Sequence, residues 1–205
     1  LFLEFKNGSG RHYTVGYEKL NARKGEWAWL LDRIFEEGKS LSALDQCITE
    51  EIAELGKPGF KHQIVLGLPE AIRGQKDWGE IDGKAMDFSN YPDRIAACKW
   101  YIDQVRRRFD EGNYQYVELA GFYIISEEIV VSPAVEDGWN HELKRSEEVV
   151  PPVAEYLHAL NECLCWIPYN RAAGYRNWKR FGIDYAYMQP NYFWEGQKSL
   201  SQFFS

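Results

Sequence analysis

Apolar residues along this chain form two alternating patterns, short continuous runs and longer stretches with helical spacing. Short apolar runs bounded by turn residues are typical of strands that are buried on both faces. Stretches in which apolar residues recur every three or four positions predict amphipathic helices. The alternation of the two patterns indicates an α/β protein whose parallel sheet is covered by helices. The expected strands are residues 1–5, 63–69, 116–126, 164–169 and 185–194, and the expected helices are residues 27–35, 41–55, 92–112, 147–161 and 175–182.

Cap and turn residues support several of these boundaries. Gly56 follows the second helix, and Gly112 ends the third. Pro92 suits the first turn of that third helix, because proline needs no backbone N–H partner there. The polar stretches 70–91 and 130–145 are expected to be long loops.

Two architectures satisfy the alternation, a doubly wound sheet and a (β/α)8 barrel. The segment "NGSGRH" after the first run has neither the spacing of a phosphate-binding glycine loop nor an immediate helix. Polar and aromatic residues instead gather just after successive strands, in "PEAIR", "SEEI", "PYNRAAGY" and "PNYFWE". Barrels place their active sites at these carboxyl ends. A barrel typically needs eight strands and ~250 residues, and five strands cannot close one. We expect residues 1–205 to form a single domain.

Composition narrows the classes of ligand. The chain has 45% hydrophobic and 27% charged residues, as soluble globular proteins do. No apolar run approaches the ~20 residues of a membrane helix. A net charge of −7 argues against a nucleic-acid surface, which needs Lys and Arg against phosphates. Aromatic residues make up 16% of the chain, and rings with an apolar face and a polar edge suit sugars.

The cysteines and histidines do not form a metal-binding or nucleophilic pattern. Cys47, Cys98, Cys163 and Cys165 include no CxxC pair and no cluster with histidine at zinc spacing. We interpret all four as small buried or half-buried residues. The sequence therefore predicts neither a metal nor a cofactor.

Several longer motifs resemble a known family. They are "LFLEFKNGSGR", "GEIDGKAMDFSNYPDRIAACKWYIDQV", "GFYIISEEI", "WIPYN" followed by "AAGY", and "MQPNYFW". In this order and spacing they are similar to a bacterial family of unknown function, found in Bacteroides and Bacillus relatives and grouped with glycoside-hydrolase-like TIM barrels. The resemblance covers essentially all 205 residues.

This resemblance implies an architecture and a location. The chain would hold about five β/α units, strands two to six of an eight-stranded TIM barrel. It would then be a piece of a longer protein, or part of that protein would be absent from the sequence. The resemblance also implies an extracytoplasmic location, periplasmic or secreted.

The resemblance further implies a role for Glu127 and Glu128. Glycosidases of this barrel type carry a general acid, a Glu, at the end of strand four and a nucleophile at the end of strand seven. Adjacent residues on a strand point to opposite faces, so these two carboxylates are not the acid and nucleophile pair. Alternate residues of a strand point to the same face, so Tyr123 and Glu127 share one face. A tyrosine near a barrel mouth can form hydrogen bonds with its hydroxyl there. We therefore favour Glu127 as the inward acid, with Glu128 as the alternative if the strand end bulges. Two solvated carboxylates opening a loop are the structural alternative.

Other strand-end residues are candidates for binding substrate. Arg73 suits a substrate carboxylate or sulfate, although a salt bridge within its loop is the alternative. Asparagine and glutamine amides both donate and accept, as sugar hydroxyls require. The candidates are Tyr123, Glu70, Arg73, Trp166, Tyr169, Asn170, Gln189, Asn191 and Tyr192.

Two function classes remain open. The first is a glycoside hydrolase, or a protein close to one, that acts on a polysaccharide or glycan by carboxylate acid–base catalysis. The second is a carbohydrate-binding barrel without catalysis. In both, the partner is a carbohydrate and no nucleic acid is involved. A carboxylate on the seventh strand would discriminate between them.

Overall fold

The computed structural model describes residues 10–14, 20–129 and 146–190. The expected strand at 1–5, the expected loop at 130–145 and residues 191–194 of the last expected strand lie outside the described residues. Within the described part, four parallel strands form one sheet, and their order follows the chain. This confirms a mixed α/β fold with a parallel sheet. The strands are β1 (His62–Leu68), β4 (Val117–Ile124), β5 (Cys163–Trp166) and β6 (Tyr185–Ala186).

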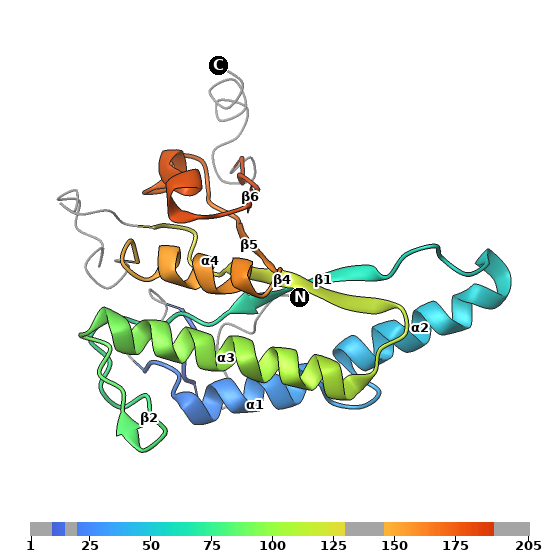
Figure 1. The fold of residues 1–205 in the computed structure, drawn as a ribbon, viewed down its shortest axis with the longest axis horizontal. Helices are drawn as coiled ribbons and strands as arrows, with labels where there is room; N and C mark the ends of the chain where they lie inside the picture. The colour runs from blue at the N-terminus through green and yellow to red at the C-terminus, as the bar shows by residue number, and fades with distance from the viewer. Residues whose placement is uncertain (1–9, 15–19, 130–145, 191–205) are drawn as a thin grey trace.

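Helices cover one face of this sheet (Figure 1). Helix α3 (Tyr91–Gly112) joins β1 to β4, α4 (Val150–Ala159) precedes β5, and the 3-10 helix η1 (Tyr175–Phe181) precedes β6. Helices α3 and α4 contact each other as well as strands of the sheet, so they lie on the same side of it. Helix α1 (Lys24–Ile34) packs against α3.

Helix α2 (Ser40–Leu55) is attached at the amino end of the sheet, where β4 begins. The carboxylate of Asp45 accepts hydrogen bonds from the backbone N–H groups of Gln115 at 3.1 Å and Tyr116 at 2.7 Å. These two residues directly precede β4, so the helix fixes where that strand begins.

The core lies between the sheet and the helices. Leu66, Phe122 and Leu164 stand in one row across three strands and are fully buried. Aromatic residues continue this core toward α1. The ring centroid of Trp27 lies 5.2 Å from that of Trp78 and 5.9 Å from that of Tyr101, both in edge-to-face geometry. Such pairs are favourable beyond the area they bury. Much of the aromatic content that the sequence suggested for sugar binding is therefore structural.

One glycine sets the close approach of β4 to β5. The pairing of β1 with β4 shifts register between Ile64 and Val65, which leaves an extra residue in β4. Gly121 follows it with a φ of +156°, and a Cβ there would collide with the backbone of Cys163. A β-bulge at this point changes the direction of the strand toward its carboxyl end.

The structure contains one local element that the sequence does not predict. The expected loop 70–91 contains a hairpin, β2 (Glu80–Ile81) and β3 (Lys84–Ala85), with positive φ at Asp82 and Gly83. Asp-Gly is a favoured hairpin turn, but two-residue strands are too short to show alternation.

The described helices can also be compared with the thickness of a bilayer. Within the described residues, no helix has both the length and the apolar composition needed to cross one.

Candidate active site

The carboxyl ends of β4, β5 and β6 meet at one edge of the sheet. The pairing of β5 with β6 continues beyond the two strands, because Tyr169 and Gln189 form a further parallel bridge. The N–H of Gln189 donates to the carbonyl of Pro168 at 2.8 Å, and the N–H of Asn170 donates to the carbonyl of Gln189 at 2.9 Å. This backbone pairing holds the side chains of Tyr169 and Gln189 beside the segment that follows β4.

Glu127 is the exposed carboxylate of this edge. The side-chain Nε2 of Gln189 donates a hydrogen bond to its Oε1 at 2.6 Å. The same nitrogen also donates to the carbonyl of Ile167 at 3.0 Å. The amide thus orients a carboxylate that stays accessible to a ligand.

Glu128 is the buried carboxylate, with 6% of its surface exposed. The hydroxyl of Tyr169 donates a hydrogen bond to its Oε1. The two neighbouring glutamates therefore use two different partners, one from the segment after β5 and one from the segment after β6. Since regular pairing of β4 ends at Ile124, strand parity alone does not decide how the two carboxylates point. Their orientation relative to a closed barrel stays a prediction.

The backbone around the glutamates is fixed by the segment after β5. The indole N–H of Trp166 donates to the carbonyl of Ser126 at 2.8 Å, and the N–H of Ile129 donates to the carbonyl of Ala173 at 2.9 Å. Gly174 has a φ of +82°, and a Cβ on it would collide with the carbonyl oxygen of Ile129. Trp166 is fully buried, so it supports the site from beneath.

The remaining predicted residues are distributed around this edge. Tyr123 is half-buried on β4, where it pairs with Gly67 and Cys165. The carboxylate of Glu70 accepts a hydrogen bond from the hydroxyl of Thr14 at 2.8 Å. Arg73 lines a separate surface cavity beside the first turn of α3, and neither Glu127 nor Glu128 belongs to that lining. Asn191 and Tyr192 lie outside the described residues.

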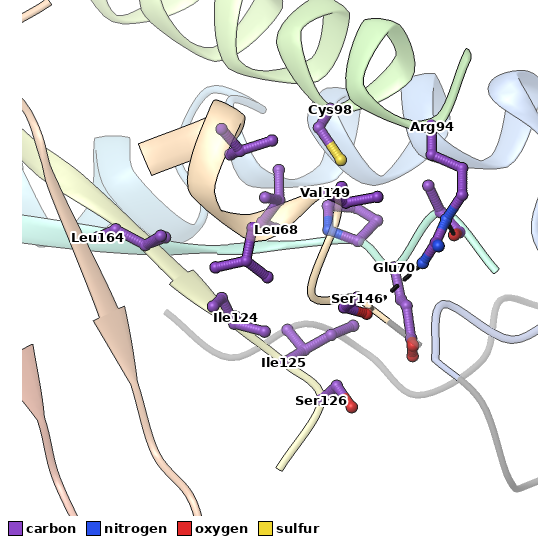
Figure 2. Close-up of a pocket in the computed structure, with 14 residues that line it drawn as sticks. Leu68, Glu70, Arg94, Cys98, Ile124, Ile125, Ser126, Ser146, Val149 and Leu164 are labelled. Carbon is purple, nitrogen blue, oxygen red and sulfur yellow. Dashed lines mark hydrogen bonds between the residues drawn. The ribbon is translucent and has the colours of Figure 1, made fainter. Parts of the chain in front are cut away.

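A small apolar cavity lies behind the site, between the sheet and helices α3 and α4 (Figure 2). Its volume is about 50 Å³, room for roughly three or four water molecules but not for a sugar ring. Arg94 and Cys98 reach it from α3, and Ile124 and Ser126 reach it from the end of β4. It therefore belongs to the core of the sheet.

The polar groups of this cavity have structural roles. Arg94 is 4% exposed, and its Nε donates to the carbonyl of Ala71 at 2.7 Å. Its Nη2 donates to the hydroxyl of Ser146 at 3.5 Å, the dashed line in Figure 2. Burial lowers the pKa of Arg94 and raises the pKa of the Cys98 thiol to about 12. Cys98 is therefore a protonated thiol at neutral pH and not a nucleophile.

Cys163 and Cys165 likewise lack the features of a reactive pair. Their sulfurs lie 3.8 Å apart on β5. Burial raises the pKa of both thiols, that of Cys165 to about 12. Across the described ranges, no three His, Cys, Asp or Glu side chains come together in a way that could hold a metal ion.

Two exposed aromatic residues at this edge are absent from the residues that the sequence singles out. Tyr185 and Tyr187 lie in and just after β6, and their rings are stacked, with centroids 6.4 Å apart. The available signal is the alternation in "YAYMQ", in which two aromatic residues and Gln189 occupy every second position. Hydrophobic patterning alone assigns this stretch to a strand and says nothing of which rings stay exposed.

The fold and the edge define an α/β protein with a carboxylate-containing site after the strands of a parallel sheet. The family model of a domain of unknown function, DUF4855, matches residues 1–203, so the chain belongs to this family. This match confirms the part of the resemblance that concerns an uncharacterised family, and the grouping with glycosidase barrels stays a prediction. The comparison with curated proteins gave no match. The comparison with solved structures also gave none.

Proposed function

We propose that this chain is part of a glycosidase-like (β/α)8 barrel that acts on a polysaccharide or other glycan through carboxylate acid–base catalysis. The parallel strands in sequential order support the architecture. So does the placement of α3 and α4 on one face, because a barrel wall carries its helices outside. A doubly wound sheet would carry them on both faces.

The observation that carries the proposal is the exposed carboxylate of Glu127 after β4, oriented by the amide of Gln189. Glycosidic cleavage needs a protonated carboxyl group that donates its proton to the leaving oxygen. The hydrogen bond from Gln189 uses Oε1, so Oε2 is the oxygen that would carry this proton. We assign Glu127 the role of the general acid.

Glu128 has a positioning role in this proposal. It is buried, and the hydroxyl of Tyr169 holds it. A buried carboxylate fixed in this way anchors the backbone that presents Glu127. The opposing carboxylate would come from the seventh strand of the barrel, ~5–5.5 Å away in a retaining enzyme and ~6.5–9.5 Å away in an inverting one.

The test is Glu127→Gln in the intact protein, on a glycoside that the wild type cleaves. This change keeps the shape of the side chain and removes the proton, so we expect turnover to fall about 10²–10⁴-fold. A dinitrophenyl glycoside has a good leaving group and needs less protonation, so its bond-cleaving step should fall much less.

Glu128→Gln keeps a side-chain oxygen that accepts the hydrogen bond from Tyr169, so it serves as the matched control and should keep most of the activity. A greater loss in Glu128→Gln than in Glu127→Gln would exchange the two roles. Turnover at the wild-type level in both variants would show that neither glutamate is the general acid, which would contradict the mechanism.

A second candidate is a barrel that binds a glycan without cleaving it. The stacked, exposed Tyr185 and Tyr187 favour glycan binding whether or not catalysis follows. Turnover by the wild-type protein distinguishes the two functions, because a binding barrel would retain glycan without releasing products.

A further inference from the structure

The side-chain amide of Gln189 is held in one orientation by two hydrogen bonds. Its Nε2 donates to Oε1 of Glu127 at 2.6 Å and to the carbonyl of Ile167 at 3.0 Å. A primary amide has two N–H groups, and these two acceptors use both. Exchanging the amide oxygen and nitrogen would place an acceptor against a carboxylate and a carbonyl, so the hydrogen bonds permit only the orientation described. The nitrogen of Gln189 is therefore committed to the protein, and its Oε1 is the atom left to interact with a ligand.

That oxygen is an acceptor without a protein donor. Gln189 is half-buried, and its Oε1 accepts no hydrogen bond from any residue in the described part of the chain. An amide oxygen can only accept, and it requires a donor when water is displaced from it. A ligand bound at this position therefore has to supply an O–H or N–H group.

The contact between Gln189 and Glu127 crosses one strand of the sheet. Gln189 follows β6 and Glu127 follows β4, and β5 lies between these two strands. In a barrel, side chains of alternate strands meet in one layer of the interior, and active sites lie at the carboxyl ends of the strands. Both bonds of the amide are made by the segments that follow β4 and β5. The position of Oε1 therefore depends on these bonds and not on how much of the sheet is left open.

We propose that Oε1 of Gln189 accepts a hydrogen bond from a hydroxyl of the glycan and thereby selects substrates that carry this hydroxyl beside the scissile bond. This inference rests on the proposed function, in which Glu127 protonates the leaving oxygen. The oxygen and nitrogen of an amide are bonded to the same carbon, so Oε1 lies next to the nitrogen that contacts Glu127. The selected hydroxyl must therefore belong to one of the two sugar residues that the scissile bond joins.

The test combines a variant of Gln189 with substrates that lack single hydroxyls. Disaccharides of neutral, amino and uronic sugars are screened for cleavage by the intact protein, and every monodeoxy form of the best substrate is then assayed. Removal of one particular hydroxyl should lower kcat/KM of the wild type about three- to tenfold, the contribution of one hydrogen bond between uncharged groups. Gln189→Met keeps nearly the same length and removes the acceptor, so the same deoxy substrate should lower kcat/KM of this variant less than about twofold.

The quantity that decides is the ratio of these two losses. A missing hydroxyl also changes the intrinsic reactivity of a glycoside, but this change is the same for both proteins and cancels in the ratio. Gln189→Met also releases Glu127, and it may not fold fully, but both effects lower kcat/KM for the parent and deoxy substrates alike. Neither effect can produce a ratio that differs at one hydroxyl.

Gln46→Met is the matched control. The Nε2 of Gln46 donates to Oε1 of Glu50 at 2.8 Å on the exposed surface of α2. The change therefore breaks the same kind of amide–carboxylate pair away from the site. This variant should cleave the parent disaccharide and each of its deoxy forms as the wild type does.

The outcomes separate this inference from the proposed function. Equal losses in the wild type and in Gln189→Met at every hydroxyl would overturn the inference, because the amide would then only orient Glu127. In that case a large loss of turnover in Glu127→Gln would leave the proposed function standing.

A protein that binds a disaccharide without cleaving it would end the glycosidase proposal, and calorimetric dissociation constants would then replace kcat/KM in the same ratio. A ratio of one at every hydroxyl would again overturn the acceptor role of Gln189. A wild-type protein that neither cleaves nor binds any of the disaccharides would overturn both proposals.

Discussion

Glu127 and Glu128 are neighbours in sequence and opposites in environment. Glu127 is exposed, and its Oε1 accepts a hydrogen bond from the amide of Gln189. Glu128 is buried and accepts a hydrogen bond from the hydroxyl of Tyr169. Burying a carboxylate is costly unless hydrogen bonds compensate for the lost water. The structure of this edge therefore depends on the bond from Tyr169 to Glu128, and access for a ligand depends on Glu127.

Tyr169→Phe tests this dependence, because it removes the hydroxyl and keeps the ring. Loss of the donor to a buried carboxylate should lower the free energy of unfolding by about 1–3 kcal/mol at pH 7, measured by urea denaturation. Tyr175→Phe is the matched control. Tyr175 accepts a hydrogen bond from the exposed Arg176 at 2.7 Å, and surface changes of this kind stay within about 0.5 kcal/mol. Equal stability of the two variants would contradict the role of Tyr169.

At the scale of single residues, the sequence predicts which side chains lie at this edge of the sheet better than it predicts their contacts. It places Glu127 and Glu128 after one expected strand and places Tyr169 and Gln189 in the next two, and the structure brings these four together. Trp166 is predicted to bind substrate, but it is fully buried and supports Ser126. Position after a strand follows from hydrophobic patterning, while the direction of a side chain depends on loop geometry that no pattern encodes.

The segment between β5 and η1 is the element that holds the site in place. Gly174 directly precedes η1, has a left-handed backbone conformation, and leaves room for the carbonyl of Ile129, the residue after Glu128. A side chain at this position would be strained by its φ and would also push the two segments apart. The anchoring of Glu128 thus requires a glycine that is 46 residues away in sequence.

Gly174→Ala should destabilise the protein by more than about 1 kcal/mol, since alanine at a positive φ is strained. A chain of this size should then lose at least about 2–4 °C in melting temperature, measured by calorimetry, and turnover should fall because the glutamates move. Gly83→Ala is the control. Gly83 has a similar φ of +78°, and with Asp82 it forms a two-residue turn in which both residues are left-handed, but a Cβ added to it would meet nothing within 4 Å, so it reports the strain without the collision. Equal effects of the two changes would show that the contact with Ile129 is unimportant.

The long elements are predictable from the sequence and the short ones are not. Helices α1, α2 and α3 and strands β1 and β4 agree with the sequence prediction because each shows several periods of its pattern. The β2–β3 hairpin has two residues in each strand and is held by an Asp-Gly turn. The last strand is expected over 185–194, yet its regular part in the described chain is Tyr185–Ala186. Pro190 cannot donate to a strand ladder, and hydrophobic patterning gives this residue too little weight.

For the molecule as a whole, the sequence predicts the direction of the strands, but the order of the strands is seen in the structure and the closure of the sheet is not predicted by patterning. Strands that alternate with helices must be parallel, and the four described strands run in sequential order. Closure into a barrel depends on pairing at the outer edges of the sheet, which no residue inside a strand specifies. A barrel would therefore depend on how this sheet pairs with further strands.

Hydrogen exchange at β6 tests that closure in the intact protein. The N–H groups of Tyr187 and Gln189 donate to the carbonyls of Trp166 and Pro168, so both should exchange slowly in any architecture. Consecutive amides of an extended strand point to opposite edges, which directs the N–H groups of Ala186 and Met188 away from β5. A barrel would pair these two with a seventh strand and slow their exchange as well, a result that site-resolved NMR or fragmentation mass spectrometry can measure. Fast exchange at Ala186 and Met188 beside slow exchange at Tyr187 and Gln189 would make β6 an open edge and contradict the barrel.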